Sequence, residues 1–593
     1  MGLGFLSKIC HNCQKKSPPP VHYPVFLTIL LIFVFASPNN HDMEPPKWLQ
    51  NSFSFFLIAL LCSGCVQRFD RAGGLTVFRY NEPGNITSLD PVYARNQTNI
   101  WASSQLYNSL VELDDDLKVR PSLAHSWEIS ADGMAYTFFL RKGVRFHDNP
   151  CFPGGAGREV RADDFVYSLN RLIAPSLNSP GAWVMNQAGR RADGSLDMEA
   201  VNDSVLIIRL NRPFPPFLGL LSMTYCSAIP REAIEKYGSD FRRNPVGTGP
   251  FRFQYWKEGV KLVFRKNEHY FETDGGHSLP YLDAVAISFI IDRQTAFLEF
   301  VKGNLDFLSG VDASYKDELL TPSGHMQPKY HDRFDMITMP FLNHEYLGMM
   351  VNEHRLPENW PLLEKKVRQA INYGFDRERM LAFLRNNIGI PAHGGFVPMG
   401  MPGFSENSGG YSYNPDLARR LLREAGFPGG VGLPVFTLHT NQNYQDIAQY
   451  IQHELAKIGV RVSIDVMPPA TLREAMAKGE AMFFRASWIA DYPDAENFLA
   501  LFYSKNHSPA GPNYTHFRHA GFDSLYERSL SLTDDSDRFN LYRKMDSIII
   551  AEAPVVFLFY DQSVRFVPRH ITGLSNNPLN HLDLKRVKSL YPD

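Results

Sequence analysis

The sequence predicts an α/β fold with mixed sheets, organised in two or three lobes. Its 593 residues, 44% hydrophobic and 21% charged, provide more than enough length to bury several hydrophobic cores. A strand–helix–strand pattern over residues 436–466 is typical of parallel β-structure. Short apolar runs separated by Gly/Pro clusters precede it and indicate a part of the chain that is richer in β-structure.

The strand–helix–strand unit is the clearest of these elements. Apolar and polar residues alternate over 436–439 and again over 460–466, which predicts two strands. Between them, the apolar residues of 447–458 recur at helical spacing and stop at Gly459. A connection of this length joins parallel strands by a right-handed crossover.

A second helix near 472–478 leads to an apolar run at 483–488 and then to the polar loop 491–494. Ligands of open α/β sheets lie beyond the carboxyl ends of strands, so this loop is the predicted position of a site. Another helical run, 367–375, indicates that the same lobe begins well before residue 400.

The middle of the chain contains short strands, such as 136–140, and turn signals. Gly247-Thr248-Gly249 lacks the third glycine and the lysine that phosphate-binding loops need, so we interpret it as a tight turn.

The N-terminus carries two apolar runs, 25–36 and 53–62, both shorter than the roughly 20 residues of a membrane-spanning helix. The second run ends in Leu61-Cys62-Ser63-Gly64-Cys65, which resembles a bacterial lipobox and implies that Cys65 becomes the lipidated N-terminus. We therefore expect residues 1–64 to be a leader, with Met43 as the true start. The mature protein is then a membrane-anchored lipoprotein of the bacterial periplasm or cell envelope.

The charge and cysteine content limit the possible partners. A formal net charge of -2 gives no broad attraction to nucleic acid, so we expect no nucleic-acid partner. After Cys65 only Cys151 and Cys226 remain, and an even pair in an exported protein permits one disulfide. We predict no metal site, because Cys10 and Cys13 precede the expected start.

Six segments, in this order and at this spacing, resemble the extracellular solute-binding proteins of peptide importers, which include oligopeptide-, dipeptide- and nickel-binding proteins. The segments are Ser88-Leu89-Asp90-Pro91, 121–128, 136–148, 161–165, 245–251 and 367–373. The resemblance implies a periplasmic-binding-protein-like fold of type II, in which two lobes built from three domains close around a hinge. It places domain I at 66–112, 237–341 and 556–593, domain II at 113–236, and domain III at 342–555.

The resemblance also implies a peptide site, since a binder of many peptides must recognise the ammonium, the backbone and the carboxylate that all peptides share. Asp491 matches the aspartate that pairs with the ammonium. Arg485 matches a candidate clamp for the carboxylate, with a structural ion pair as its alternative role. The other expected peptide contacts are Trp488 and Tyr492, from the same segment as Asp491, and Asn96 and Gln97, from the facing loop 95–98.

The sequence favours a transport function over catalysis. No common signature of a nucleophile or metal set occurs, so the chain is predicted not to be an enzyme and to need no cofactor. Expected partners are a peptide, an ABC permease with its ATPase subunits, and the membrane through the lipid, with the protein as a monomer. Segment 440–444 lacks an arginine that dipeptide-binding relatives use, which disfavours a strict dipeptide binder. The same fold binding a nickel complex, haem or an oligosaccharide, or serving as a peptide sensor or adhesin, remains the alternative.

Overall fold

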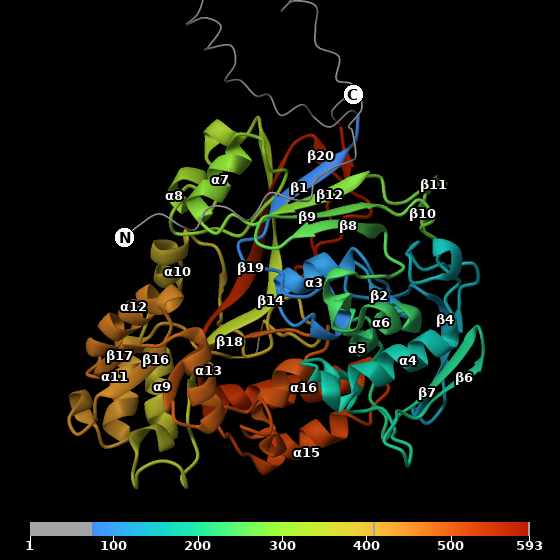
Figure 1. Ribbon diagram of the computed structural model, residues 1–593. Helices are drawn as coiled ribbons and strands as arrows, with labels where there is room; N and C mark the ends of the chain where they lie inside the picture. Colours follow the sequence, from blue (N-terminus) through green and yellow to red (C-terminus); the bar gives the residue numbers. More distant parts are fainter. Residues whose placement is uncertain (1–73, 407–408, 591–593) are drawn as a thin grey trace, which may run out of the picture. The chain divides into compact units, whose positions relative to one another are not determined.

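The computed structural model describes residues 74–406 and 409–590, so the predicted leader and Cys65 lie outside the described residues. The described residues form a first lobe, residues 74–333 and 569–590, and a second lobe, residues 350–554 (Figure 1). Two long strands, β14 (Phe334–Met349) and β19 (Val555–Pro568), run side by side from one lobe into the other.

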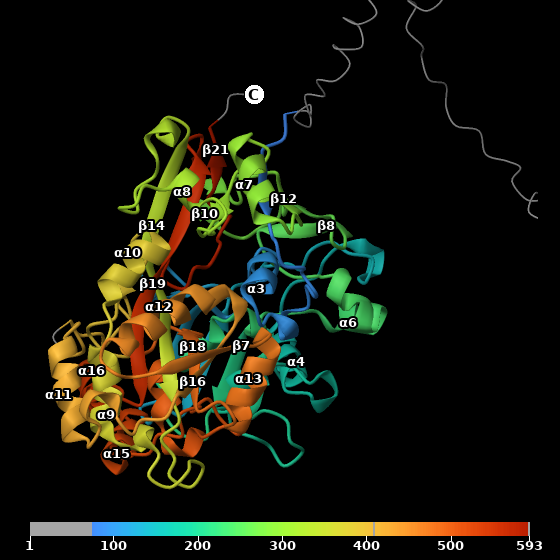
Figure 2. The ribbon, with the colours of Figure 1, turned by 90° about the vertical axis from the view of Figure 1, so that its left-hand side faces the viewer.

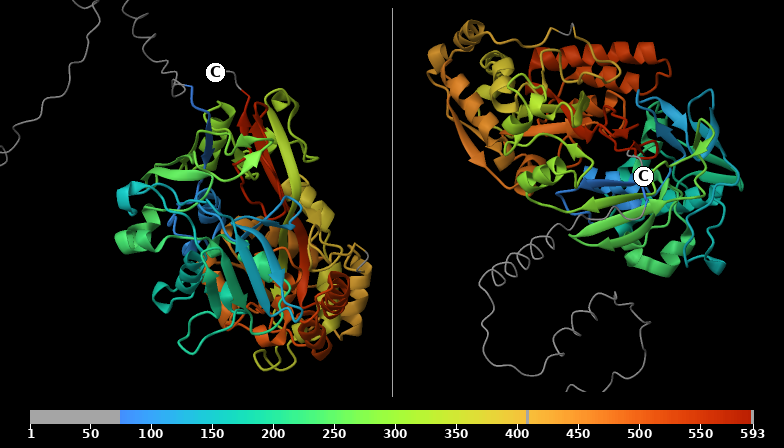
Figure 3. Two further views of the ribbon diagram at one scale, coloured as in Figure 1. Left: turned by 90° about the vertical axis from the view of Figure 1, so that its right-hand side faces the viewer. Right: turned by 90° about the horizontal axis from the view of Figure 1, so that it is seen from above.

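The first lobe contains two four-stranded sheets. The first has the order β1-β12-β9-β8, with β1 parallel to β12 and the other pairs antiparallel. Its strands are β1 (Val77–Asn81), β12 (Ala284–Ser288), β9 (Lys261–Lys266) and β8 (Phe251–Lys257). The second sheet is antiparallel, in the order β4-β5-β7-β6 (Figure 3). Its strands are β4 (Ala124–Ile129), β5 (Ala135–Leu140), β7 (Val205–Arg209) and β6 (Met198–Asn202).

The strand expected at 136–140 is therefore confirmed as β5. Alternate residues of β5 and β7 are buried, because one face of this sheet is covered by α4 (Ala162–Leu172). The shorter elements of the first lobe are α3 (Gln97–Ser104), α5 (Phe217–Leu221), α6 (Arg231–Tyr237), α7 (Arg293–Val301), α8 (Lys316–Leu319), β2 (Val111–Leu113), β3 (Val119–Pro121), β10 (Thr273–Asp274), β11 (His277–Ser278), β13 (Leu308–Ser309), β20 (Ile571–Thr572) and β21 (Lys588–Ser589).

The last residues of the chain complete the first lobe. Trp101 Nε1, on α3, donates a hydrogen bond to Asn580 O at 2.8 Å, and Gln105 Nε2 donates to Leu582 O at 2.6 Å. Trp101 is almost fully buried by this contact and by the surrounding core. The N-terminal and C-terminal parts of the described chain thus share one hydrophobic core.

The sheet that contains β14 and β19 extends through both lobes, in the order β13-β19-β14-β18-β16-β17. In the first lobe β13 pairs with β19, and in the second lobe β18, β16 and β17 continue the sheet, with β15 (Ile390–Pro391) paired to β19. The predicted strand–helix–strand unit is confirmed. It consists of β16 (Phe436–Thr440), α12 (Gln445–Ala456) and β17 (Val462–Val466), with β16 and β17 parallel. The predicted second helix is α13 (Pro469–Lys478), and the run after it is β18 (Phe483–Ile489), which lies between β14 and β16.

Helices cover this sheet. The remaining helices of the second lobe are α9 (Lys365–Tyr373), α10 (Arg377–Arg385), α11 (Pro415–Glu424), α14 (Glu496–Leu499), α15 (Ala520–Ser529) and α16 (Asp535–Glu552). A core of buried apolar side chains joins α9, α10, α11 and α12 to one face of the sheet. None of the helices within the described ranges is both long and apolar enough to cross a bilayer.

The connection between the lobes is a two-stranded ribbon (Figure 2). Its antiparallel register is regular from Phe334 to Pro340 and shifts between Pro340 and His344, where the ladder has a bulge. The three-domain division stays a prediction. Its boundary between residues 341 and 342 falls inside β14, close to this bulge.

The segment Gly247-Thr248-Gly249 differs from the tight turn that we expected. Gly249 N donates to Leu106 O at 2.9 Å and His147 N donates to Gly247 O at 2.8 Å, so the segment passes between two other parts of the backbone. A Cβ at Gly249 would lie 2.6 Å from both Gln105 O and Tyr107 N. Glycine is required here because the two backbones approach so closely.

We therefore expect Gly249→Ala to lower the free energy of unfolding by about 3 kcal/mol, because the added methyl overlaps backbone that cannot rotate away. Urea denaturation measures the change. Gly143→Ala is the control: Gly143 has a positive φ of 78° but open space around it, so only about 1 kcal/mol is expected. Equal losses in the two variants would contradict the steric explanation.

The disulfide that the pair Cys151 and Cys226 permits is not formed in this structure, where both are free thiols. Cys226 is buried, and its thiol donates to Leu220 O at 3.5 Å. Cys151 lies in a separate loop, where burial raises its pKa to about 11. An even cysteine count is compatible with a disulfide but carries no information on distance.

Candidate functional site

The end of β18 and the loop after it bring together three of the predicted ligand residues: Trp488 on the strand, and Asp491 and Tyr492 in the loop. Asn497, on α14, orients two of them. Its Oδ1 accepts hydrogen bonds from Trp488 Nε1 at 2.9 Å and from the backbone N–H of Asp491 at 3.2 Å. Its Nδ2 donates to Asp491 Oδ2 at 3.3 Å. The single asparagine thereby fixes the position of the carboxylate relative to the indole.

The carboxylate of Asp491 can be reached from solvent, although much of its surroundings is protein rather than water. Its side chain is exposed by surface area, yet protein surrounds it on most sides, and this burial raises its pKa to about 6. The hydrogen bond from Asn497 opposes the rise. No positively charged side chain of the described residues contributes to this pKa or forms an ion pair with Asp491.

The neighbouring buried carboxylates are all satisfied within the protein. Asp494 forms an ion pair with Arg538 at 3.1 Å and accepts a hydrogen bond from Tyr542 Oη at 2.7 Å. Glu496 accepts hydrogen bonds from the hydroxyls of two tyrosines. Asp491 differs because it is reachable from solvent and has no cation beside it, which makes it the candidate for a cationic ligand group.

Tyr492 is buried where the two lobes meet, and it lines a cavity of about 290 Å³ with Gly219 and Asp494. Its hydroxyl donates to Glu496, and its ring lies 6.4 Å from the ring of Trp183 in the first lobe. Gly219, also in the first lobe, is so close that an added Cβ would contact Tyr492 Cβ at 3.5 Å. The predicted role of Tyr492 in peptide contact is therefore less well supported than a role in contact between the lobes.

Arg485, the predicted carboxylate clamp, already has a partner. Its guanidinium forms an ion pair with Glu345 on β14, and both side chains are buried. The ring of Tyr444 stacks against it, with 3.2 Å between Cζ and the ring centroid. Tyr444 Oη also donates to Glu345 Oε1 at 3.3 Å. These contacts favour the alternative role of Arg485, a structural ion pair.

The strand geometry explains why Arg485 is separated from the other predicted residues. Arg485 pairs with Leu347 and Trp488 pairs with His344 in the ladder of β18 and β14. Successive residues of a strand point to opposite faces, so two residues three positions apart lie on different faces of the sheet. Arg485 accordingly contacts the side of Tyr444, whereas Trp488 contacts Asn497.

The first lobe contributes loop 95–98 and the start of α3. Asn96 is the N-cap of α3, and its Oδ1 accepts a hydrogen bond from Asn99 N at 2.9 Å, so part of its side chain is committed to the helix. Gln97 is exposed at the first position of the helix. Arg95, just before the cap, is exposed and lines a cavity of about 760 Å³ with Tyr93 and Asn96.

Tyr225 connects the two sides. Its pKa is raised to about 12, chiefly by burial and also by the negative charge of Asp491, while the positive charge of Arg95 opposes the rise. The phenol of Tyr225 is thus within reach of the charge of Asp491 in the second lobe and of Arg95 in the first lobe. The loop after β18 and loop 95–98 therefore both approach Tyr225. Neither Tyr225 nor Asn497 was among the predicted site residues, because contacts between residues so far apart in sequence leave no signal in a single sequence.

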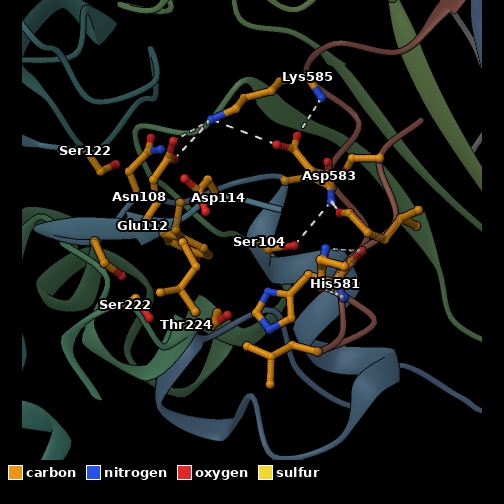
Figure 4. Close-up of a pocket in the computed structure, with 18 of the residues that line it drawn as sticks. Ser104, Asn108, Glu112, Asp114, Ser122, Ser222, Thr224, His581, Asp583 and Lys585 are labelled. Carbon is orange, nitrogen blue, oxygen red and sulfur yellow. Dashed lines mark hydrogen bonds and ion pairs between the residues drawn. The ribbon is translucent and has the colours of Figure 1, made fainter. Parts of the chain in front are cut away.

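A second polar pocket lies entirely within the first lobe (Figure 4). Its volume is about 140 Å³, well below the roughly 300 Å³ of ordinary small-molecule sites. Lys585 Nζ lies beside it and forms ion pairs at 3.0 Å with both Glu112 and Glu272. We regard this pocket as part of the folded core. No cluster of three metal-binding side chains occurs in residues 74–406 and 409–590.

Two lobes joined by a strand ribbon, with mixed sheets, are the architecture of periplasmic binding proteins of the peptide-binding class. Solved structures of this class superpose on the chain. DppA from Helicobacter pylori in complex with the peptide STSA gives a TM-score of 0.69 at 26% identity, covering 86% of this chain and 98% of that one. HbpA2 from Haemophilus parasuis gives 0.73 at 24% identity, with 86% and 99% covered.

The chain belongs to the bacterial extracellular solute-binding proteins, family 5, whose model (family 5 Middle) matches residues 118–510. It is 28% identical over 525 residues to the dipeptide-binding protein of Escherichia coli, covering 86% of this chain and 94% of the relative. It is 29% identical over 497 residues to heme-binding protein A of Haemophilus influenzae, with 81% and 86% covered. The glutathione-binding protein GsiB of Salmonella typhimurium is 27% identical over 496 residues, with 82% and 90% covered. Membership implies a solute ligand, an ABC importer permease as partner and a location in the cell envelope.

Proposed function

We propose that this chain captures oligopeptides outside the cytoplasmic membrane and delivers them to an ABC importer, without catalysing a reaction. Asp491 is the observation that carries the proposal. It is an accessible, desolvated carboxylate that no cation of the described residues neutralises. The ammonium group at the start of a peptide supplies the missing charge, and closure of the lobes removes the pair from water.

The other parts of the peptide have separate partners in this proposal. The peptide backbone lies extended between loop 95–98 and the end of β18, and it forms hydrogen bonds with main-chain N–H and C=O groups there, as an added strand does. Lobe contacts such as that between Tyr492 and Trp183 form the closed arrangement around the ligand. Cys65 carries the lipid that keeps the protein near its permease, as proposed from the lipobox-like sequence.

The test of this function is isothermal titration calorimetry on ligand-free protein with a mixed tripeptide pool and with the same pool acetylated at the amino end. We expect micromolar or tighter binding of the free peptides and loss of binding after acetylation, because acetylation removes the positive charge. Equal binding of the two pools would contradict recognition of the ammonium. Absence of binding by both pools, in protein shown to be folded, would overturn the peptide assignment in favour of another solute.

The raised pKa of Asp491 predicts a specific pH dependence. The ammonium binds the ionised carboxylate, and a group with a pKa of about 6 is mostly ionised at pH 7 but only about one-tenth ionised at pH 5. Affinity for free tripeptides is therefore expected to fall about tenfold between these pH values, while the termini of the peptide stay charged. Near pH 6, binding should release about half a proton. Titrations in two buffers of different ionisation heat measure this release, and a flat pH profile would contradict the assignment.

A further inference from the structure

Two arginines near the contact between the lobes, Arg95 and Arg473, form no ion pair within the described residues. Arg95 precedes α3 in the first lobe, and Arg473 lies on α13 in the second lobe. Both side chains are exposed. Neither forms an ion pair or a side-chain hydrogen bond with any residue in the described ranges. The nearby arginines differ: Arg171 is paired with Asp90 at 2.6 Å, and Arg485 is paired with Glu345.

Arg95 is held beside Tyr225 by local packing. The short helical turn at Pro91–Tyr93, directly before Arg95, packs against the turn at Thr224–Cys226 that carries Tyr225. The ring of Tyr225 in turn covers Gly181, where there is no room for a Cβ. Arg95 is thus positioned by the fold on the side of the first lobe that faces Asp491.

Arg473 approaches the same region from the second lobe. Ser508 Oγ donates to Met476 O at 3.4 Å, which ties the loop carrying Tyr514 to α13. Tyr514 is partly buried, and the positive charges of both Arg95 and Arg473 lower its pKa against the effect of burial. Both guanidinium groups therefore lie near one phenol, one from each lobe.

The charges of these residues do not balance. Arg95 and Arg473 contribute two positive charges and Asp491 one negative charge, and Arg485 is neutralised by Glu345. A zwitterionic peptide brings one charge of each sign and leaves one guanidinium unmatched. The two like charges that act on Tyr514 repel each other, and an anion bound between them would relieve this repulsion.

We infer that Arg95 and Arg473 form an anion site that spans the two lobes and selects short peptides with a net negative charge, that is, one ammonium and two carboxylates. This inference rests on the proposed function and adds a substrate class to it. Arg95 and Arg473 take over the role that the spacing of Arg485 suggested. Two planar guanidinium groups supply enough donors for two carboxylates, whereas the buried pair of Arg485 and Glu345 supplies none.

Three tripeptides of equal length test the inference by calorimetry: Ala-Glu-Ala, Ala-Gln-Ala and Ala-Lys-Ala, with net charges of -1, 0 and +1. We expect Ala-Glu-Ala to bind at least tenfold more tightly than Ala-Gln-Ala, and Ala-Lys-Ala to bind most weakly. Arg95→Gln and Arg473→Gln should each reduce the ratio between the first two peptides severalfold. Arg190→Gln, an exposed position on the first lobe, is the matched control and should leave the ratio unchanged.

Equal affinities for Ala-Glu-Ala and Ala-Gln-Ala, or a ratio that survives both arginine substitutions, would overturn the anion site while leaving peptide binding intact. If no tripeptide binds, the proposed function fails, and glutarate becomes the probe of the site alone. Glutarate binding that is lost in Arg95→Gln and Arg473→Gln would then support the anion site independently. Absence of glutarate binding as well would reject both proposals.

Discussion

Asp491→Ala is expected to abolish measurable capture of free peptides while leaving the fold intact. The side chain has no ion pair with any of the described residues and accepts one long hydrogen bond, from Asn497 Nδ2 at 3.3 Å, so its loss should change the free energy of unfolding by less than about 1 kcal/mol. The ligand ammonium, in contrast, would be left without its counter-charge in a desolvated position. Truncating one partner of such a pair costs about 2–5 kcal/mol, which corresponds to a loss of affinity of roughly thirtyfold to several thousandfold. Calorimetry with the tripeptide pool measures the change.

Two further variants separate charge from geometry at this position. Asp491→Asn keeps the size of the side chain and its contact with Asn497, so a loss similar to that of the alanine variant would identify the charge as the cause. Asp416→Asn, on the exposed face of α11, removes a carboxylate of the same lobe and should leave affinity unchanged. Wild-type affinity in Asp491→Asn would contradict the ammonium pair.

Lys585→Met is expected to produce the largest loss of stability, about 3–5 kcal/mol. The ammonium of Lys585 is almost fully buried and lies 3.0 Å from carboxylate oxygens of Glu112 and Glu272, with Asp583 at 3.9 Å. Figure 4 shows Lys585 between Glu112 and Asp583. Even with Lys585 present, burial raises the pKa of Glu112 to about 7. Without Lys585, three carboxylates would face one another in a desolvated position. Urea denaturation measures the loss.

The cause of that loss can be checked by restoring charge balance. In Lys585→Met the carboxyl group of Glu112, whose pKa burial already raises, loses its counter-charge, so its unfavourable contribution grows as the pH rises and shrinks as it becomes protonated. The difference from wild type should therefore be smaller at pH 5 than at pH 8. Adding Glu112→Gln and Glu272→Gln should recover much of the stability. Lys588→Met, which removes an exposed lysine stacked on Tyr281, is the control with little expected effect. A deficit that does not depend on pH would contradict the electrostatic explanation.

The sequence predicted local elements better than long-range contacts. The strand–helix–strand unit around α12 and the strand β18 were predictable because alternation and helical spacing are local properties. The placement of Asp491 after a strand was predictable for the same reason. The length of β14 and β19 was not, because their central bulge interrupts the alternation that would have marked each as one strand.

Three residues show why the site was harder to predict than the fold. Arg485 was assigned from its spacing to Trp488, but the faces of β18 alternate and place the two side chains apart. Cys226 was a candidate for a disulfide on count alone, and the fold places its thiol beside Leu220 instead. Arg95 was included only as the first residue of loop 95–98, because nothing in its neighbourhood in the sequence reveals that its charge acts on Tyr225 and Tyr514.

The dependence of the first lobe on the end of the chain has a consequence for the order in which the protein matures. Trp101 and Gln105 find their hydrogen-bond partners at Asn580 and Leu582, and Glu112 finds its counter-charge at Lys585. A chain that emerges from its N-terminus cannot bury these groups until its last residues are free. The second lobe, whose elements are continuous in sequence, can then form earlier than the lobe that precedes it in the chain. Removal of about fifteen C-terminal residues would consequently act on the opposite end of the sequence, exposing α3 to proteolysis.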